Sequence, residues 1–420
     1  MKKMLPLIFG ICSLISMPGN SMRACSVFTA SGIDRIYAAT NKDWNNEKTR
    51  IRFYAPSEGK YGRVYFGYQV SEGFQNVGGM NEHGLWYDGA SLPFRSDIDN
   101  HFNKPRVKGE LCEKALEECA TVEEVIQLYT EFYTPHWQGH SMWADRQGNS
   151  VIIEYGEKDV VFLRKEQDYQ VMTNFYLTDS TNLRWANCHR FKAITALLDN
   201  EEELSIELMT CALEASHKEG LTPTLYSNVY DLKNGDIYVY HFHYYGEFVR
   251  FNLAEELEKG DQYLELPSLF YGIKMKTPFP DQVLNGSDVC FKWSGGAADY
   301  EVRYSEDQGF NEYNSEKVSN PLPDETQSLS YAPAGIILII AWSFRKRRRQ
   351  CMLFLSLLLL LGSCSSCTKL FISPQWPESM EFSACIKDLS PGRTYHWKIV
   401  SLVENRMSSE SIAQTFTCSD

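Results

Sequence analysis

The chain has 420 residues, of which 43% are hydrophobic, and a formal net charge of -13. This length suffices for two or three domains with a sizeable core. The acidic balance excludes a nucleic-acid-binding role, because phosphate binding needs clustered lysine and arginine. The one dense basic run, 345–349, lies between two apolar runs and indicates a membrane flank.

Residues 1–24 have the layout of a secretory signal peptide: a basic start, an apolar run, and the small residue Ala24 before Cys25. Cleavage after Ala24 would give Cys25 a free α-amine beside its thiol. A thiol with a pKa of about 8.5 and an amine with a pKa of about 7.7–8.0 titrate close together. One residue could then supply both nucleophile and base. A buried or lipidated cysteine near a mature N-terminus is the alternative.

The region from Cys25 to Asn252 is rich in strands. Residues 25–30 and 35–40 indicate a hairpin about Gly32, and 50–54 and 63–68 are expected to continue its sheet. Helices are predicted at 110–120, 121–132, 189–198 and 204–216, and further strands at 141–145, 150–155, 160–164, 171–174, 227–231 and 236–243. Strands, then helices, then strands predict an α+β class, with helices packed outside sheets.

From about Tyr263 the pattern changes to the alternating strands of a β-sandwich. The strands fall in two groups, 291–305 and 382–417, and residues 389–395 resemble the loop and strand near the end of fibronectin type III domains. Neither group has enough strands for a closed core, so we predict one sandwich over 270–420. Cys385 and Cys418 are its candidate disulfide pair, since export permits disulfides.

The sandwich is interrupted at Pro321–Lys369, where two apolar runs flank the basic run. Each apolar run is about a dozen residues, or roughly 17 Å of helix against a hydrocarbon core of about 30 Å. We predict a membrane hairpin at 332–363, with the basic run in the cytoplasm and the domains outside. A lipoprotein-like signal ending at Cys364, or a fusion of two reading frames, are the alternatives.

An ordered set of motifs follows Cys25. Asn41-Lys42-Asp43 comes shortly after it, and further landmarks lie at 79–85, 143–154, 172–175 and 189–191. This order resembles the N-terminal-nucleophile (Ntn) amidases of the choloylglycine hydrolase and penicillin V acylase type, and their acyltransferase-like relatives. The resemblance implies a four-layer αββα catalytic domain, here 25–262, which acts on linear amides without a cofactor.

The resemblance also implies catalytic roles for four residues. Cys25 attacks the amide carbonyl, Asp43 holds the α-amine, Asn174 donates to the oxyanion, and Arg190 orients Cys25 and the carboxylate. Without the family, Asp43 would be a turn or cap carboxylate, Asn174 a strand-end turn residue and Arg190 half of a surface ion pair.

Two positions depart from the pattern of the bile-salt and penicillin members. Thr40 stands where those members usually have arginine, and Ser91 stands where they have an asparagine of the oxyanion hole. The Ser91 hydroxyl or a backbone amide is therefore expected to be the second donor, and bile-salt specificity is not assumed.

Two other motifs are interpreted without a catalytic role. His241 and His243 would lie on one strand face, but no third ligand is near, so no metal site is expected. Asn81 begins a motif that is typical of a turn followed by a strand, which indicates a structural residue.

We expect an exported, membrane-associated hydrolase, periplasmic or at the cell surface, that cleaves the C–N bond of a small-molecule N-acyl amide. An acyltransferase that passes the acyl group to an amine is one alternative. A non-enzymatic surface protein that presents the sandwich for binding is the other. The sequence leaves the acyl group, the amine and the oligomeric state open.

Overall fold

The computed structural model of the 420-residue chain describes residues 25–96, 98, 104–133, 138–179, 187–200, 203–319, 376–402 and 409–419. The signal peptide expected at 1–24 and the membrane hairpin expected at 332–363 lie outside these residues, so both stay predictions. Within the described ranges, no helix combines the length and the apolar character that a membrane crossing requires.

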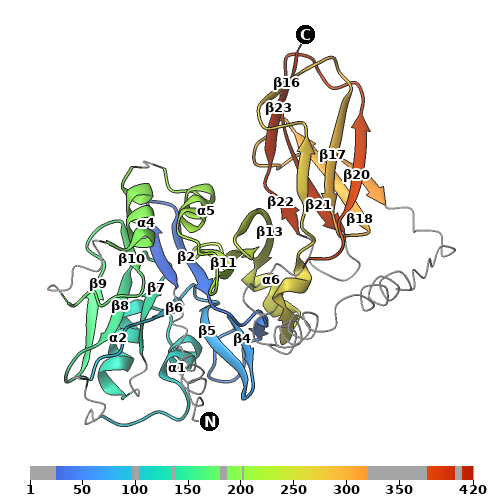
Figure 1. Cartoon of the computed structure of the whole chain (residues 1–420). Coiled ribbons are helices and arrows are strands. Elements are labelled where there is room, and N and C mark those ends of the chain that lie inside the picture. The colour runs from blue at the N-terminus through green and yellow to red at the C-terminus, as the bar shows by residue number, and fades with distance from the viewer. Residues whose placement is uncertain are drawn as a thin grey trace, which may run out of the picture.

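The structure is mostly β-sheet with few helices (Figure 1). In spatial order, the first sheet begins with β10 (Tyr169–Met172), β1 (Ser26–Ser31), β2 (Ile36–Asp43), β11 (Thr224–Asp231), β12 (Asp236–His241) and β13 (Tyr244–Asn252). The second sheet consists of β14 (Gln262–Glu265), β3 (Thr49–Tyr54), β4 (Arg63–Val70), β5 (Gly73–Asn81), β6 (Trp86–Ser91), β7 (Gly139–Ala144), β8 (Ser150–Tyr155) and β9 (Val160–Arg164).

The hairpin predicted at the start of this region is confirmed. β1 and β2 pair antiparallel from Ser26 opposite Asn41 to Ser31 opposite Ile36, and the Gly32 amide closes the turn. The expectation that 50–54 and 63–68 continue this sheet is wrong. β2 lies between β1 and β11, so neither of its edges is open to β3, and β3 and β4 belong to the second sheet.

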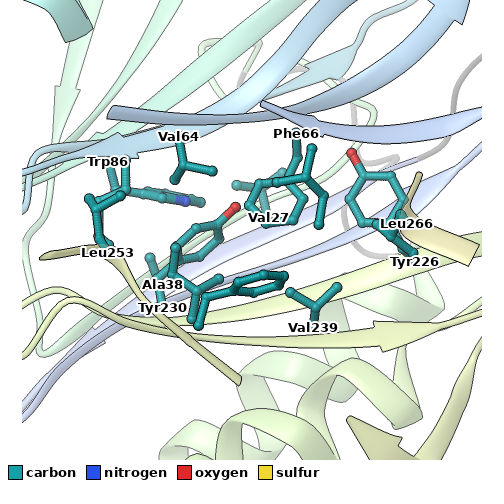
Figure 2. Close-up of a cluster of buried hydrophobic side chains, with 14 of the residues drawn as sticks. Val27, Ala38, Val64, Phe66, Trp86, Tyr226, Tyr230, Val239, Leu253 and Leu266 are labelled. Carbon is teal, nitrogen blue, oxygen red and sulfur yellow. The ribbon is translucent and has the colours of Figure 1, made fainter. Parts of the chain in front are cut away.

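The two sheets face each other across a shared apolar core. Val64 and Phe66 of the second sheet lie opposite Val27, Ala38 and Val239 of the first (Figure 2). These side chains alternate with outward-facing ones along each strand, as the period of a β-strand requires. Cys25 is part of this core, so its thiol lies on the inner face of the first sheet.

Helices cover the outer face of each sheet. They are α1 (Leu111–Glu118) and α2 (Val122–Glu131) on the second sheet, and α4 (His189–Asn200) and α5 (Ile206–Ala215) on the first. The predicted capping box at the start of α2 is present: Thr121 accepts from the Glu124 amide, and the Glu124 carboxylate accepts from the Thr121 amide. α6 (Leu253–Glu258) and the short helix η1 (Leu266–Leu269) lead into the C-terminal strands.

The C-terminal strands enclose a separate core. One sheet contains β15 (Lys274–Thr277), β17 (Val289–Gly295) and β20 (Met380–Ile386); the other strands are β16 (Gln282–Asn285), β18 (Asp299–Ser305), β19 (Asn314–Ser319), β21 (Thr394–Leu402), β22 (Glu410–Ser411) and β23 (Gln414–Ser419). Strands from before and after the interruption pair directly, β17 with β20 and β18 with β21. Phe291, Trp293 and Trp397 fill the core between the sheets. β22 pairs with β13 and so joins these strands to the first sheet.

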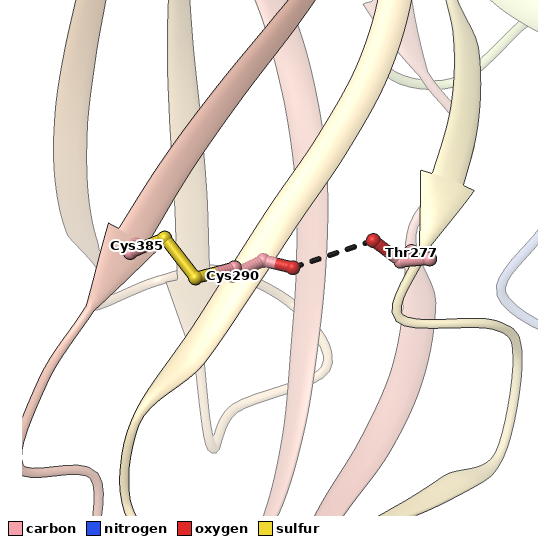
Figure 3. Close-up of a disulfide and its surroundings, with 3 residues drawn as sticks. All are labelled: Thr277, Cys290 and Cys385. Carbon is pink, nitrogen blue, oxygen red and sulfur yellow. Dashed lines mark hydrogen bonds between the residues drawn. A yellow bond between two sulfur atoms is a disulfide. The ribbon is translucent and has the colours of Figure 1, made fainter.

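The disulfide expected between Cys385 and Cys418 is wrong. Cys385 bonds instead to Cys290, which lies directly opposite it on β17 (Figure 3). Cys418 is on β23, which pairs with β16 and β21 and not with β20, and it packs into the core as a free thiol. Thr277 donates a hydrogen bond to the carbonyl of Cys290 at 3.3 Å.

Removing this disulfide should destabilise the C-terminal strands. Cys385→Ser opens a crosslink between residues 95 apart in sequence, and a disulfide typically stabilises a fold by about 2–4 kcal/mol. We expect a loss of this size in the free energy of unfolding, measured by urea denaturation. Cys211→Ser, at an exposed cysteine outside the C-terminal strands, is the control. Equal stability of both variants and the wild type would contradict the assignment.

Candidate active site

Cys25 lies directly before the first residue of β1 and is 4% exposed. Continuing the β1–β2 register by one residue places it opposite Lys42. The backbone of Asp43 hydrogen-bonds to its sulfur. Burial raises the pKa of the Cys25 thiol above its ordinary value, although the Lys42 charge acts to lower that pKa.

Arg190, in the first turn of α4, brings the four residues predicted as catalytic together. Its Nη1 atom donates to the Cys25 carbonyl at 2.7 Å, and its Nη2 atom donates to Asn174 Oδ1 at 2.8 Å. Nη1 also lies 3.7 Å from Asp43 Oδ2. A guanidinium can hold several acceptors at once because its five N–H donors point in fixed directions from a rigid, planar group. The side chain is only 15% exposed, so its partners lie inside the site.

Asp43 is fully buried beside Arg190. Its Oδ1 atom accepts a hydrogen bond from the Thr224 hydroxyl at 2.6 Å. Burial raises the pKa of Asp43 to about 7, although Arg190 and Thr224 both act to lower it. No donor among the described residues forms a hydrogen bond with Oδ2. This carboxylate therefore titrates near neutral pH and presents one oxygen with acceptor capacity.

Asn174 follows β10 and connects to Ser91 at the end of β6. Its Nδ2 atom donates to the Ser91 carbonyl at 2.7 Å, while its Oδ1 atom accepts from Arg190. Both ends of the side-chain amide are thus held, which fixes its orientation. Ser91 joins this network through its main chain, and not through the hydroxyl that the sequence analysis considered.

Cys25 and Ser91 also line a cavity of about 640 Å³. Aromatic and aliphatic side chains form much of its wall, among them Trp44, Tyr68 and Val70. Cavities of a few hundred Å³ with an apolar lining and a few polar groups are typical small-molecule sites. The thiol is therefore buried, but it adjoins a space in which a ligand fits.

The first asparagine of the N-x-D motif has a structural task. Asn41 points to the opposite face of β2 from Lys42 and donates to the Leu213 carbonyl and the Ser216 hydroxyl of the α5 end. Its Oδ1 atom accepts from Ser227. Asn41 therefore fixes α5 against the strand that carries Asp43.

A buried pair, His140 and Glu154, supports the segment that carries Asn174. His140 Nδ1 lies 2.9 Å from Glu154 Oε1, and Nε2 lies 2.7 Å from the Thr173 carbonyl. Both ring nitrogens therefore lie within hydrogen-bonding distance of an oxygen, and the His140 and Glu154 side chains are fully buried.

The Glu154 carboxylate also accepts from the segment after Asn174. The amide of Leu177 donates to Oε1, and the amide and hydroxyl of Thr178 donate to Oε2. Burial acts to raise the pKa of Glu154, but the contacts from His140 and these donors lower it below its ordinary value. The Glu154 carboxylate therefore holds the chain on both sides of Asn174: through His140 it is linked to Thr173, and it binds Leu177 and Thr178 directly.

Sequence reasoning missed both His140 and Lys42 as parts of this site. Lys42 stands inside the N-x-D motif, is 2% exposed and forms an ion pair with Asp88 of β6. For Lys42 its place in this motif was the signal. For Glu154 the signal was its place at the end of the 143–154 motif; for His140 the sequence held none.

Asn81 is structural, as expected. Its side chain donates to the carbonyls of Leu116 and Cys119 at the end of α1 and accepts from the His83 and Leu85 amides. These bonds close the turn between β5 and β6.

The strand predicted to reach His243 is wrong. β12 ends at His241, and Phe242 and His243 have positive φ values of 50° and 47°, so the two histidines do not share a strand face. Burial lowers the pKa of His241 to about 4. Within the described part of the chain, no three metal-ligating side chains cluster.

Glu154→Gln should loosen the Asn174 segment. The substituted amide places N–H groups where donors now point, and an unsatisfied buried group costs about 1–3 kcal/mol. We expect a loss of that size in the free energy of unfolding and faster amide hydrogen exchange over 173–179. Glu157→Gln, at an exposed glutamate just after β8, is the control. Unchanged exchange in Glu154→Gln would show that the pair does not hold this segment.

Comparison with known proteins identifies related sequences and structures. Residues 30–241 match the model of the family described as acyl-coenzyme A:6-aminopenicillanic acid acyl-transferase. This range contains Asp43, Asn174 and Arg190 and begins after Cys25. No curated protein matches the sequence.

Two solved proteins are similar in structure. Penicillin V acylase from Agrobacterium tumefaciens is 20% identical with a TM-score of 0.47, over 58% of this chain and 91% of its own. Two variants of the conjugated bile acid hydrolase from Clostridium perfringens are each 15% identical with a TM-score of 0.44, over 57% of this chain and 96% of theirs.

Proposed function

Because the chain belongs to the acyl-coenzyme A:6-aminopenicillanic acid acyl-transferase family, we propose that it is an enzyme that cleaves the C–N bond of a linear N-acyl amide with Cys25 as nucleophile. The observation that carries this proposal is the Arg190 guanidinium, which contacts the main chain of Cys25, the side chain of Asn174 and the Asp43 carboxylate. The two facing sheets with helices outside support the four-layer αββα fold that we propose for 25–262.

The proposed reaction starts when the mature chain begins at Cys25. The α-amine takes the thiol proton, and the sulfur forms a bond to the amide carbonyl carbon. The C–N bond of the resulting tetrahedral species breaks, and the amine leaves with the proton from the α-ammonium group. Water then adds to the Cys25 thioester, with the α-amine as base, and a carboxylic acid and the free thiol are released.

The neighbouring side chains have separate tasks in this reaction. Asp43 Oδ2 has acceptor capacity for the α-ammonium group, whose charge the carboxylate stabilises. Asn174 Nδ2, oriented by Ser91 and Arg190, is a donor for the developing oxyanion. Arg190 places Cys25 relative to both. The apolar lining of the cavity suits the acyl part of the substrate.

An acyltransferase is the second candidate, since the family is described by that activity. The two functions share the thioester and differ only in whether water or an amine receives the acyl group. Supplying an amine together with an N-acyl amide discriminates between them, because transfer yields a new N-acyl amide and hydrolysis yields the acid.

The proposed mechanism predicts that two changes at Cys25 are equally damaging. Cys25→Ser keeps the α-amine but replaces the thiol by a weaker nucleophile. One extra residue ahead of Cys25 keeps the thiol but converts the amine to an amide, which cannot accept a proton. We expect turnover to fall by at least about 10² in each variant, the lower limit of a general-base contribution.

The measurement is turnover of a panel of N-acyl amides from short acyl-amino acids to bile-acid conjugates. Intact mass must first establish that the extra residue is retained. A cysteine that used a separate histidine base would lose activity only on the first change. Robust activity of the extended protein would therefore rule out the N-terminal amine as base.

The pKa of Asp43 predicts the acid limit of activity. The carboxylate is the required form, and it is lost as the pH falls through about 7, so kcat/KM should decline below that pH. Asp43→Asn should lower turnover at alkaline pH by about 10²–10⁴ and remove the decline of kcat/KM at low pH. Asp34→Asn, at an exposed aspartate, is the matched control. If kcat/KM of Asp43→Asn declines at low pH as it does in the wild type, a group other than Asp43 causes the decline.

A further inference from the structure

Lys42 and Asp88 form a buried ion pair that the proposed reaction does not use. Lys42 Nζ contacts Asp88 Oδ1 directly, and the two side chains are 2% and 1% exposed. β2 of the first sheet carries the lysine and β6 of the second carries the aspartate. The pair therefore joins the two sheets inside the protein, where separating two charges from water is costly.

The pair lies next to the Cys25 thiol. Directly opposed residues of an antiparallel pair point to the same face with Cβ atoms about 4.5–5.5 Å apart, and the β1–β2 register continues to Cys25 opposite Lys42. Cys25 and Lys42 accordingly line the same cavity. Asp43 and Asn41 point to the other face, toward Thr224 and α5. The sulfur thus faces the lysine, while the catalytic carboxylate lies behind the strand.

Lys42 is engaged too fully to act as a substrate ligand. Besides Asp88, its ammonium donates to the Gly89 carbonyl at 3.2 Å and to the Val77 carbonyl at 3.5 Å. These three acceptors match the three donors of an ammonium group. Asp88 Oδ1 also accepts from the Gly89 amide. The lysine therefore influences the site through its charge and position, without contacting the substrate.

We propose that Lys42 and Asp88 are a charge-balanced positioning pair that sets how readily the Cys25 thiol ionises. Lys42 stabilises the anionic sulfur, and Asp88 limits that stabilisation. The balance matters because a thiolate that is stabilised too far loses intrinsic nucleophilicity. The inference rests on the proposed function only in taking Cys25 as the nucleophile.

The charged and titratable groups around the thiol support this assignment. Burial is the largest effect and raises the pKa of Cys25; Lys42 lowers it, whereas Asp43 and Asp88 raise it. Lys218 before β11 and Tyr226 on β11 also interact electrostatically with Cys25, and Arg190 contacts its carbonyl. Among these, Lys42 is the charge that favours the thiolate from the same face of the strand. Burial raises the pKa of Asp88 to about 6 despite Lys42, so Asp88 is ionised where Cys25 titrates.

The test is the pH dependence of Cys25 alkylation by iodoacetamide in the full chain. Peptide mass spectrometry resolves Cys25 from the other cysteines. Lys42→Met should move the midpoint of alkylation upward by about one pH unit, the lower end of what one nearby charge produces. Asp88→Asn should move it downward by a similar amount. Lys48→Met, at an exposed lysine just beyond β2, should leave it unchanged.

Opposite shifts distinguish the proposal from a purely structural pair. Loss of a structural tie would destabilise both variants without moving their midpoints apart, and midpoints that are unmoved or move together would overturn the proposal. If Lys42→Met does not fold, the proposal can still be tested with Asp88→Asn and with the double variant of Lys42→Met and Asp88→Asn. The double variant leaves no buried unpaired charge. Its alkylation midpoint should lie above that of Asp88→Asn. A wild-type Cys25 that resists alkylation at every pH would also overturn it.

Alkylation does not depend on turnover, so this inference and the proposed function can fail separately. Opposite midpoint shifts together with full turnover of Cys25→Ser would refute Cys25 as the nucleophile and leave the tuning of its ionisation standing. Loss of turnover in Cys25→Ser, with unmoved alkylation midpoints in the Lys42 and Asp88 variants, would support Cys25 as the nucleophile and refute the tuning of its ionisation.

Discussion

The site depends on one guanidinium. Arg190 lies on α4 and contacts Cys25 just before β1, Asn174 after β10 and Asp43 on β2. Cys25 and Asp43 are far from Asn174 and Arg190 in sequence. An arginine that is only 15% exposed loses favourable contacts if any of its acceptors is displaced. The helix, the strand end and the loop are therefore positioned together.

Local sequence patterns predicted the elements better than their arrangement. The β1–β2 hairpin and helices α1, α2, α4 and α5 follow from turn residues, apolar spacing and the Thr121 capping box, which act over a few residues. The assignment of β3 and β4 to a second sheet depends on β11, which occupies the open edge of β2 from nearly two hundred residues away. The Cys290 partner of Cys385 was missed for the same reason, because strand pairing across the interruption decides it.

The residues of the site also fall into those that the sequence could indicate and those that it could not. Asp43, Asn174 and Arg190 stand in ordered motifs, so a family resemblance could point to them, and the structure places them around one another. Lys42 and His140 have charged or polar side chains whose meaning comes from a distant partner, Asp88 or Glu154. A sequence does not state which buried charges meet, and that pairing is what gives each of these residues a task.

The bond from Arg190 to residue 25 ends on a main-chain carbonyl and not on the sulfur. The contact between Arg190 and residue 25 therefore does not depend on the side chain at that position. Under the proposed function, binding of an acyl amide and cleavage of its C–N bond are therefore separable properties of this fold. A variant without the thiol would keep the cavity, the oriented Asn174 amide and the buried Asp43 carboxylate, and under the proposed function it would bind an N-acyl amide without cleaving it.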